Sequence, residues 1–224
     1  MNSFFKTTIV VVLFFYGCTK DAPVFYSYPD FEVLTIGSTL SELIISLDNH
    51  YLIAADKNNN QLRFIDITDD LTLVKNIWVG SKPTSLDFTS SGDTLFAGLE
   101  GSSQIALIDM NTLEVIGYFQ TDMDNPYDIA VVPGNRMVVS YMSSNPSLNR
   151  TKLYQWSTIE DSIVFEPLTI PPYNFIDYID LAGPLTIIED SNAPGEYLLY
   201  LMDKFQGTPI GVHKFQITDE GLWE

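Results

Sequence analysis

One interval of 43 residues recurs through the first half of this 224-residue chain. Asp66 closes the run Gln-Leu-Arg-Phe-Ile-Asp, and Asp109, 43 residues later, closes the related run Gln-Ile-Ala-Leu-Ile-Asp. The same interval joins four further pairs: Gly37 and Gly80, Leu43 and Leu86, Leu52 and Leu95, and Ala54 and Ala97. A fixed spacing of this size indicates stacked copies of one supersecondary unit, because each copy buries its apolar face against the next.

Short apolar runs separated by turn residues fill each repeat. In the first repeat, runs at 43–47 and 51–55 flank the turn Asp-Asn-His, and two more runs follow at 61–67 and 73–79. In the second repeat, the run 105–108 is apolar on successive residues, which predicts a strand with both faces covered. Four strands in about 40 to 45 residues are typical of one propeller blade. The sequence therefore predicts an all-β protein, a β-propeller of four-stranded blades.

About four blades fit within the chain. The repeats place them at about 38–81, 82–124, 125–172 and 173–224. Residues 31–37 match the end of the next repeat, so we expect them to form the outer strand that closes a blade. Together, residues 31–224 would form the propeller, which we expect to be incomplete or open, with a full-length relative extending beyond Glu224.

Three stretches of the second repeat resemble one known family. They are Val79 to Phe88, which contains Gly-Ser-Lys-Pro; the turn Ser91-Gly-Asp; and the run that Asp109 closes. This pattern resembles the YVTN repeat family of β-propellers, and the resemblance implies a ring of blades, usually seven. The first repeat departs from the pattern, because Leu40 stands where the later repeats have Pro83 and Pro126. The third repeat lacks the closing aspartate.

The amino terminus has the pattern of an export signal. Lys6 precedes the apolar run 7–16, which is too short to cross a bilayer as a helix, and Gly17-Cys18 follows at once. This arrangement resembles the lipobox of bacterial lipoproteins. The resemblance implies a signal peptide at 1–17, an acylated Cys18 that binds membrane lipid, and a tether at 18–30. It places the protein at the outer membrane, on the periplasmic face or the cell surface. An ordinary cleaved signal and an uncleaved anchor are the alternatives.

The charge of the chain excludes one class of partner. Lys and Arg number 11 against 29 Asp and Glu, which gives a formal net charge of −18. Nucleic-acid binding needs clustered positive charge on the protein, so we expect no nucleic-acid partner. Cys18 is the single cysteine, and an intramolecular disulfide is therefore impossible.

No set of catalytic residues is evident from the sequence. The two histidines, His50 and His213, belong to different repeats, and no Gly-x-Ser-x-Gly motif occurs. The acidic turns at 66–70 and 121–125 offer oxygen ligands, but they lack the glycine and the distal glutamate of an EF-hand loop. The sequence therefore nominates no catalytic residue, no metal ligand and no cofactor.

Four residues are candidates for ligand binding. Tyr127 and Asp128 follow Pro126 at the start of the third blade, and Tyr173 and Phe175 follow a Pro-Pro pair in an expected connecting loop. Aromatic rings beside carboxylates or amides suit sugars and flat ligands, through stacking and hydrogen bonds. The alternative is that these aromatic side chains belong to the core between blades.

These observations lead to three functional hypotheses. The first is a lipid-anchored, non-enzymatic propeller of the bacterial envelope that presents one face to a small molecule, a glycan or a protein. The second is a propeller hydrolase or lactonase that depends on calcium. The third is an accessory lipoprotein of an outer-membrane nutrient transporter.

Overall fold

The computed structural model describes residues 34–35, 38–143, 145, 150–159, 162–167, 183–202, 211–218 and 221–223. The chain divides into two units, Met1–Thr35 and Ile36–Glu224, and every strand among the described residues belongs to the second. In the first unit only residues 34–35 are described, and they form no strand. The expected signal peptide and tether lie outside the described residues, as does most of the expected closing strand at 31–37.

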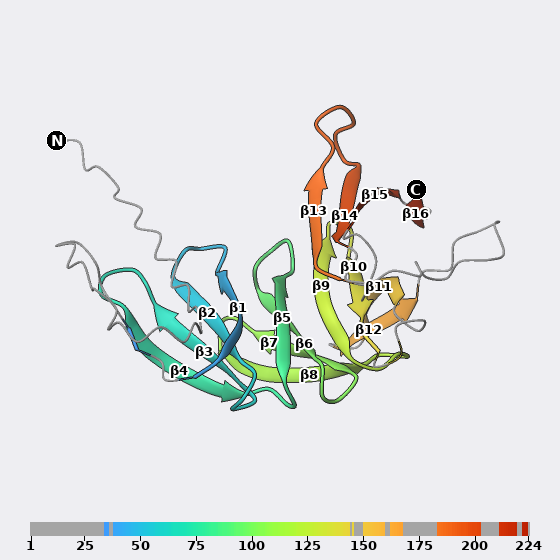
Figure 1. The fold of residues 1–224 in the computed structure, drawn as a ribbon. Helices are drawn as coiled ribbons and strands as arrows, with labels where there is room; N and C mark the ends of the chain where they lie inside the picture. Colours follow the sequence, from blue (N-terminus) through green and yellow to red (C-terminus); the bar gives the residue numbers. More distant parts are fainter. Residues whose placement is uncertain are drawn as a thin grey trace, which may run out of the picture. The chain divides into compact units, whose positions relative to one another are not determined.

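The second unit consists of four antiparallel sheets, each with four strands in sequence order (Figure 1). The first two sheets contain β1 (Leu40–Ile45), β2 (Tyr51–Asp56), β3 (Gln61–Asp66), β4 (Thr72–Trp78), β5 (Pro83–Phe88), β6 (Thr94–Leu99), β7 (Gln104–Asp109) and β8 (Glu114–Gln120). The last two contain β9 (Pro126–Val132), β10 (Arg136–Tyr141), β11 (Arg150–Ile159), β12 (Ser162–Pro167), β13 (Leu185–Glu189), β14 (Tyr197–Met202), β15 (Val212–Thr218) and β16 (Gly221–Trp223). This confirms the predicted all-β fold of four-stranded blades.

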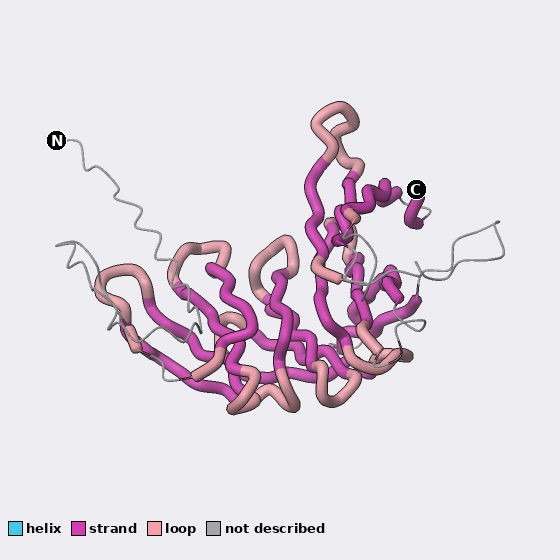
Figure 2. Tube along the Cα trace, viewed as in Figure 1, coloured by secondary structure: helices cyan, strands magenta, loops and turns pink. Residues whose placement is uncertain are grey.

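Within the described part of the chain, strands and turns account for the secondary structure, as Figure 2 shows. No helix there is long and apolar enough to cross a membrane. Each sheet is a meander, since every strand pairs with the next one along the chain. Register in the second sheet pairs Phe96 with Leu107 and Ala97 with Ala106, so that both strands bury side chains on both faces.

Three apolar clusters form the core, and each joins two consecutive sheets. The first joins the sheets β1–β4 and β5–β8, the second joins β5–β8 and β9–β12, and the third joins β9–β12 and β13–β16. Representative side chains of the three clusters, in that order, are Phe64 and Leu95; Phe96 and Tyr154; Val138 and Leu199. The sheets therefore stack face to face, which explains why β6 and β7 carry apolar residues in succession over residues 95–99 and 105–108.

The first strands of successive sheets lie beside one another. Contacts join β1 to β5, β5 to β9, and β9 to β13. The 43-residue interval reappears in these contacts. Ser41 Oγ donates to the carbonyl oxygen of Pro83 at 2.7 Å, and Thr84, 43 residues later, donates to the carbonyl oxygen of Pro126 at 3.3 Å. Equivalent residues thus form equivalent bonds between neighbouring sheets.

The turn that leads into the second sheet requires a glycine. Gly80 has φ of 111°, in a region that residues with a side chain rarely adopt, and a Cβ there would lie 2.9 Å from Leu99 Cδ1. Lys82 and Asn125, which directly precede Pro83 and Pro126, have φ of 56° and 57°. These matching values place each proline in the same position at the start of its sheet.

Candidate functional site

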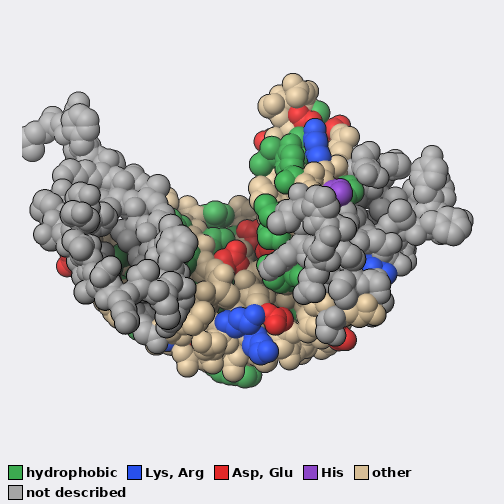
Figure 3. Space-filling model, in the orientation of Figure 1, with side chains coloured by type: hydrophobic (Ala, Val, Ile, Leu, Met, Phe, Trp, Pro, Cys, Tyr) green, Lys and Arg blue, Asp and Glu red, His purple; other side chains and the backbone are tan. Residues whose placement is uncertain are grey.

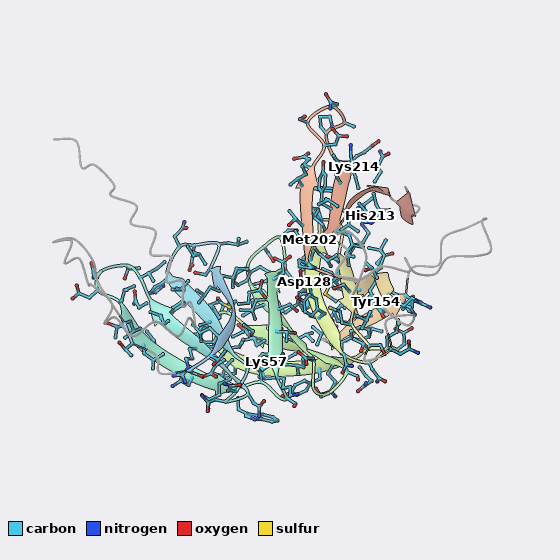
Figure 4. The ribbon with its side chains drawn as sticks, viewed as in Figure 1. Lys57, Asp128, Tyr154, Met202, His213 and Lys214 are labelled. Carbon is cyan, nitrogen blue, oxygen red and sulfur yellow. The ribbon has the colours of Figure 1, made fainter. Side chains whose placement is uncertain are left out.

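Three acidic side chains lie on the first strands of three consecutive sheets. They are Glu42 on β1, Asp87 on β5 and Asp128 on β9, and all three are partly buried. We call them the acid cluster. Acidic side chains gather on the surface where these strands lie (Figure 3), and Asp128 projects from β9 in Figure 4.

Each carboxyl of the acid cluster links its strand to the first strand of the next sheet. Asp87 Oδ2 accepts the backbone N–H of Val131 on β9 at 2.6 Å. Asp128 Oδ2 accepts the N–H of Leu185 on β13 at 2.7 Å. Glu42 accepts the N–H of Leu86 on β5. A backbone N–H of the next sheet therefore fixes the position of each carboxyl, because the hydrogen bond joins the two sheets.

Burial raises the pKa of all three groups, and the charge of a neighbouring carboxyl adds to this effect for Glu42 and Asp128. Burial is the largest cause for Glu42, followed by the charge of Asp128, and together they raise its pKa to about 8. Burial and then the charge of Asp87 raise the pKa of Asp128 to about 6, against the lowering effect of its two backbone hydrogen bonds. Burial also raises the pKa of Asp87. At neutral pH, Glu42 is protonated while Asp128 is ionised.

A buried hydroxyl lies on the strand between Glu42 and Asp128. Ser85 on β5 is 1% exposed, and its Oγ has no hydrogen-bond partner among the described residues. It falls 43 residues after Glu42 and 43 before Asp128, so the three occupy one position of the repeat. A side chain at Gly98 would collide with this hydroxyl, and glycine at 98 therefore leaves room for it. Glu42 Oε2 is likewise buried without a partner in the described part.

The structure describes two of the residues that the sequence nominated for ligand binding. Tyr127 and Asp128 are adjacent on β9, where Tyr127 is partly buried and Asp128 belongs to the acid cluster. Tyr173, Phe175 and Cys18 lie outside the described residues.

Sequence reasoning missed Glu42 and Asp87 as neighbours of Asp128. The 43-residue interval could have found Glu42, because Glu42, Ser85 and Asp128 share one repeat position. Asp87 lies two residues further along its strand than that position, and no repeat comparison points to it.

The acidic turns that the sequence offered as weak metal candidates have other partners. Asp66 Oδ2 lies 3.2 Å from His50 Nε2, and its Oδ1 accepts the hydroxyl of Thr68 at 2.6 Å. Asp122 binds Lys152 and the hydroxyl of Tyr154. In the described ranges, no group of three His, Cys, Asp or Glu side chains is placed to hold a metal ion.

Comparison with known proteins decides the fold. Residues 27–133 match the family described as lactonase, 7-bladed beta-propeller. A hydrazine synthase of Kuenenia stuttgartiensis superposes with a TM-score of 0.56 at 13% identity, covering 79% of this chain and 50% of that chain. The fold is a β-propeller. Curated proteins yield no match.

Two further solved structures, both from Bacteroides, superpose on this chain with a similar TM-score. Both carry a provisional assignment as 6-phosphogluconolactonases. The Bacteroides fragilis protein has a TM-score of 0.56 and 17% identity, covering 82% of this chain and 56% of that chain. The Bacteroides uniformis protein has a TM-score of 0.56 and 16% identity, covering 81% and 52%. The chain thus spans about half the length of the solved structures that it matches, and at these identities the likeness shows the fold alone.

The propeller fold gives the acid cluster a functional position. Blades of a propeller surround a central channel, and the strands closest to one another across blades are the innermost. Here those strands are β1, β5, β9 and β13, since they contact one another in succession. The acid cluster therefore lies on the strands that face the channel.

Proposed function

We propose that this propeller is a lactone hydrolase whose reacting groups belong to the acid cluster. The observation that carries the proposal is the pair Glu42 and Asp128, two carboxyls on innermost strands whose environments hold one protonated and the other ionised at neutral pH. Paired carboxyls with separated pKa values are the usual arrangement for general acid and base catalysis. The match to the lactonase family supports the proposal, because residues 27–133 contain the whole acid cluster.

Ring opening of a lactone needs one proton acceptor and one proton donor. Asp128 accepts a proton from the water that attacks the ring carbonyl carbon. As the bond from that carbon to the ring oxygen breaks, Glu42 donates its proton to the leaving oxygen. The product is an open hydroxy acid. Asp128 then releases its proton to solvent and Glu42 takes one up, which restores both carboxyls. Asp87 holds β9 in place through Val131 and keeps Asp128 in position.

The pH dependence of kcat/KM tests these roles. We expect a bell-shaped profile for hydrolysis of an unsubstituted sugar lactone, with a rise near pH 6 as Asp128 ionises and a fall near pH 8 as Glu42 loses its proton. Glu42→Gln should lower kcat by about 10²- to 10⁴-fold and remove the fall at high pH. Asp128→Asn should lower kcat similarly and remove the rise at low pH.

The matched control is Glu114→Gln, which makes the same chemical change at an exposed residue of β8. It should leave both the rate and the profile unchanged. Unfolding curves of each variant separate loss of chemistry from loss of fold. A protein that binds lactones without turning them over, in calcium or in chelator, would instead support the non-enzymatic binding function, and a TonB-type receptor gene beside its own would favour the nutrient-transport role.

Attachment to a membrane through Cys18 is compatible with either function. The apolar run 7–16 and Gly17 that precede Cys18 support a lipid anchor. Several acyl chains on one residue would hold the protein stably on a bilayer. Growth of the source bacterium with labelled palmitate should label the wild-type protein, and Cys18→Ser should abolish the label. Equal labelling of the two proteins would refute the anchor.

A further inference from the structure

Among the described residues, the charged neighbours of the acid cluster are carboxyls, with no cation beside them. The charges that raise the pKa of Glu42 and Asp128 come from other carboxyls, and no Lys or Arg among the described residues contributes. Three cations of the described part pair elsewhere: Lys57 with Glu100, Arg63 with Asp56, and Lys152 with Asp122. Lys57 and Lys214 both lie away from Asp128 in Figure 4. A ligand at the cluster therefore meets a negative potential.

The uncharged polar groups of the site favour hydroxyl-bearing ligands. Ser85 is buried, and its hydroxyl has no partner in the described ranges, so it can donate to or accept from a ligand. Glu42, when protonated, adds a donor, and its buried Oε2 is free of partners in the same ranges. Asp87 and Asp128 are acceptors. A ring with several hydroxyl groups satisfies all four, because its hydroxyls donate to carboxylates and accept from Ser85 and Glu42.

A phosphate group finds no suitable partner at this position in the part of the chain that the structure describes. Proteins bind phosphate with Arg forks, with Lys, or with the backbone N–H groups at helix N-termini. The described part of the chain has no helix, and the backbone N–H groups of Leu86, Val131 and Leu185 already donate to the cluster. A phosphate dianion here would face two carboxylates, with no compensating charge from the described residues.

We infer that the acid cluster selects an uncharged, polyhydroxylated lactone and excludes its phosphorylated counterpart. The inference rests on the proposed hydrolase function for the site and names its substrate class. It separates this protein from the phosphogluconolactonase assignment of its structural neighbours, because a sugar lactone phosphate carries the charge that this site repels.

The test compares glucono-1,5-lactone with its 6-phosphate on the full-length protein. We expect kcat/KM to favour the uncharged lactone by at least about 100-fold at low salt. The ratio should shrink as salt is raised, because ions screen the repulsion. Asp87→Asn removes one negative charge and should lower the ratio several-fold, whereas Glu114→Gln, at an exposed residue of another strand, should not.

Equilibrium binding separates failure of this inference from failure of the proposed function. Calorimetry uses glucono-1,5-lactam and its 6-phosphate, which bind without ring opening. Tighter binding of the uncharged lactam without any lactone turnover would support the selectivity and refute the hydrolase. Turnover that favours the phosphorylated lactone would refute the selectivity and leave the hydrolase standing. Tighter binding of the phosphorylated lactam without any lactone turnover would refute both. Absence of both turnover and lactam binding would overturn both.

Discussion

Arg63→Met should destabilise the protein by about 3 to 5 kcal/mol, because it leaves a buried carboxylate without its cation. Asp56 at the end of β2 is fully buried. Arg63 on β3 donates to its Oδ2 from Nε at 2.8 Å and from Nη2 at 2.5 Å. Ser38 and Asn59 supply the remaining hydrogen bonds to the carboxylate. Urea unfolding at pH 7 measures the loss of stability.

Asp56 also gives this destabilisation a pH dependence. Burial raises its pKa, but the hydrogen bonds from Ser38, Asn59 and Arg63 outweigh burial and lower the pKa to about 2. A group with a lowered pKa stabilises the folded state above its unfolded value near 4, and that stabilisation disappears as the pH falls toward 2. The difference between wild type and Arg63→Met should therefore be large at pH 7 and small near pH 2.

Two controls belong with this experiment. Lys57→Met removes the cation of the more exposed Lys57–Glu100 pair and should change stability by less than about 1 kcal/mol. The double variant Asp56→Leu and Arg63→Met removes both charges of the buried pair and should recover part of the loss. An Arg63→Met protein as stable as the Lys57→Met protein would show that the buried pair is not formed.

Phe96→Ala should destabilise the protein by about 3 to 5 kcal/mol, because it leaves a cavity in the apolar contact between two sheets. Phe96 on β6 is fully buried in the second apolar cluster. Its ring meets Trp156 on β11 edge to face, with centroids 5.2 Å apart, and Phe165 on β12 at 5.9 Å. Both partners belong to the next sheet, so the loss reports on stacking between blades.

Chemical denaturation followed by tryptophan fluorescence measures this effect, because Trp156 lies beside the deleted ring. Tyr118→Ala is the control. It deletes an aromatic ring on β8 that is 44% exposed, and it should cost less than about 1 kcal/mol. If the two variants lose the same stability, the sheets β5–β8 and β9–β12 do not pack as described.

The strands and their grouping into blades could be predicted from the sequence alone. The 43-residue interval places equivalent residues at equivalent positions, as Leu52 on β2 and Leu95 on β6 show. Runs such as Ile105 to Ile108 predicted strands covered on both faces, and all four side chains are buried. These features are local or periodic, so the order of residues along the chain is enough to predict them.

The acid cluster could be predicted only in part. Asp128 was nominated from its place after Pro126, and its partners were not, because their proximity depends on how the sheets stack. Asp87 approaches Val131 on the next sheet although the two occupy different positions of the repeat. Pairing across blades sets this contact, and no spacing within a single repeat encodes it.

The sequence by itself determined the all-β class, the four-stranded unit and the acidic balance of the chain, because periodicity and composition are properties of the order of residues. The tertiary structure alone decided which carboxyls become neighbours and how their pKa values separate. Burial and charge repulsion act through space between strands that lie more than 40 residues apart in the chain, so Glu42, Asp87 and Asp128 form one site only once the sheets are stacked.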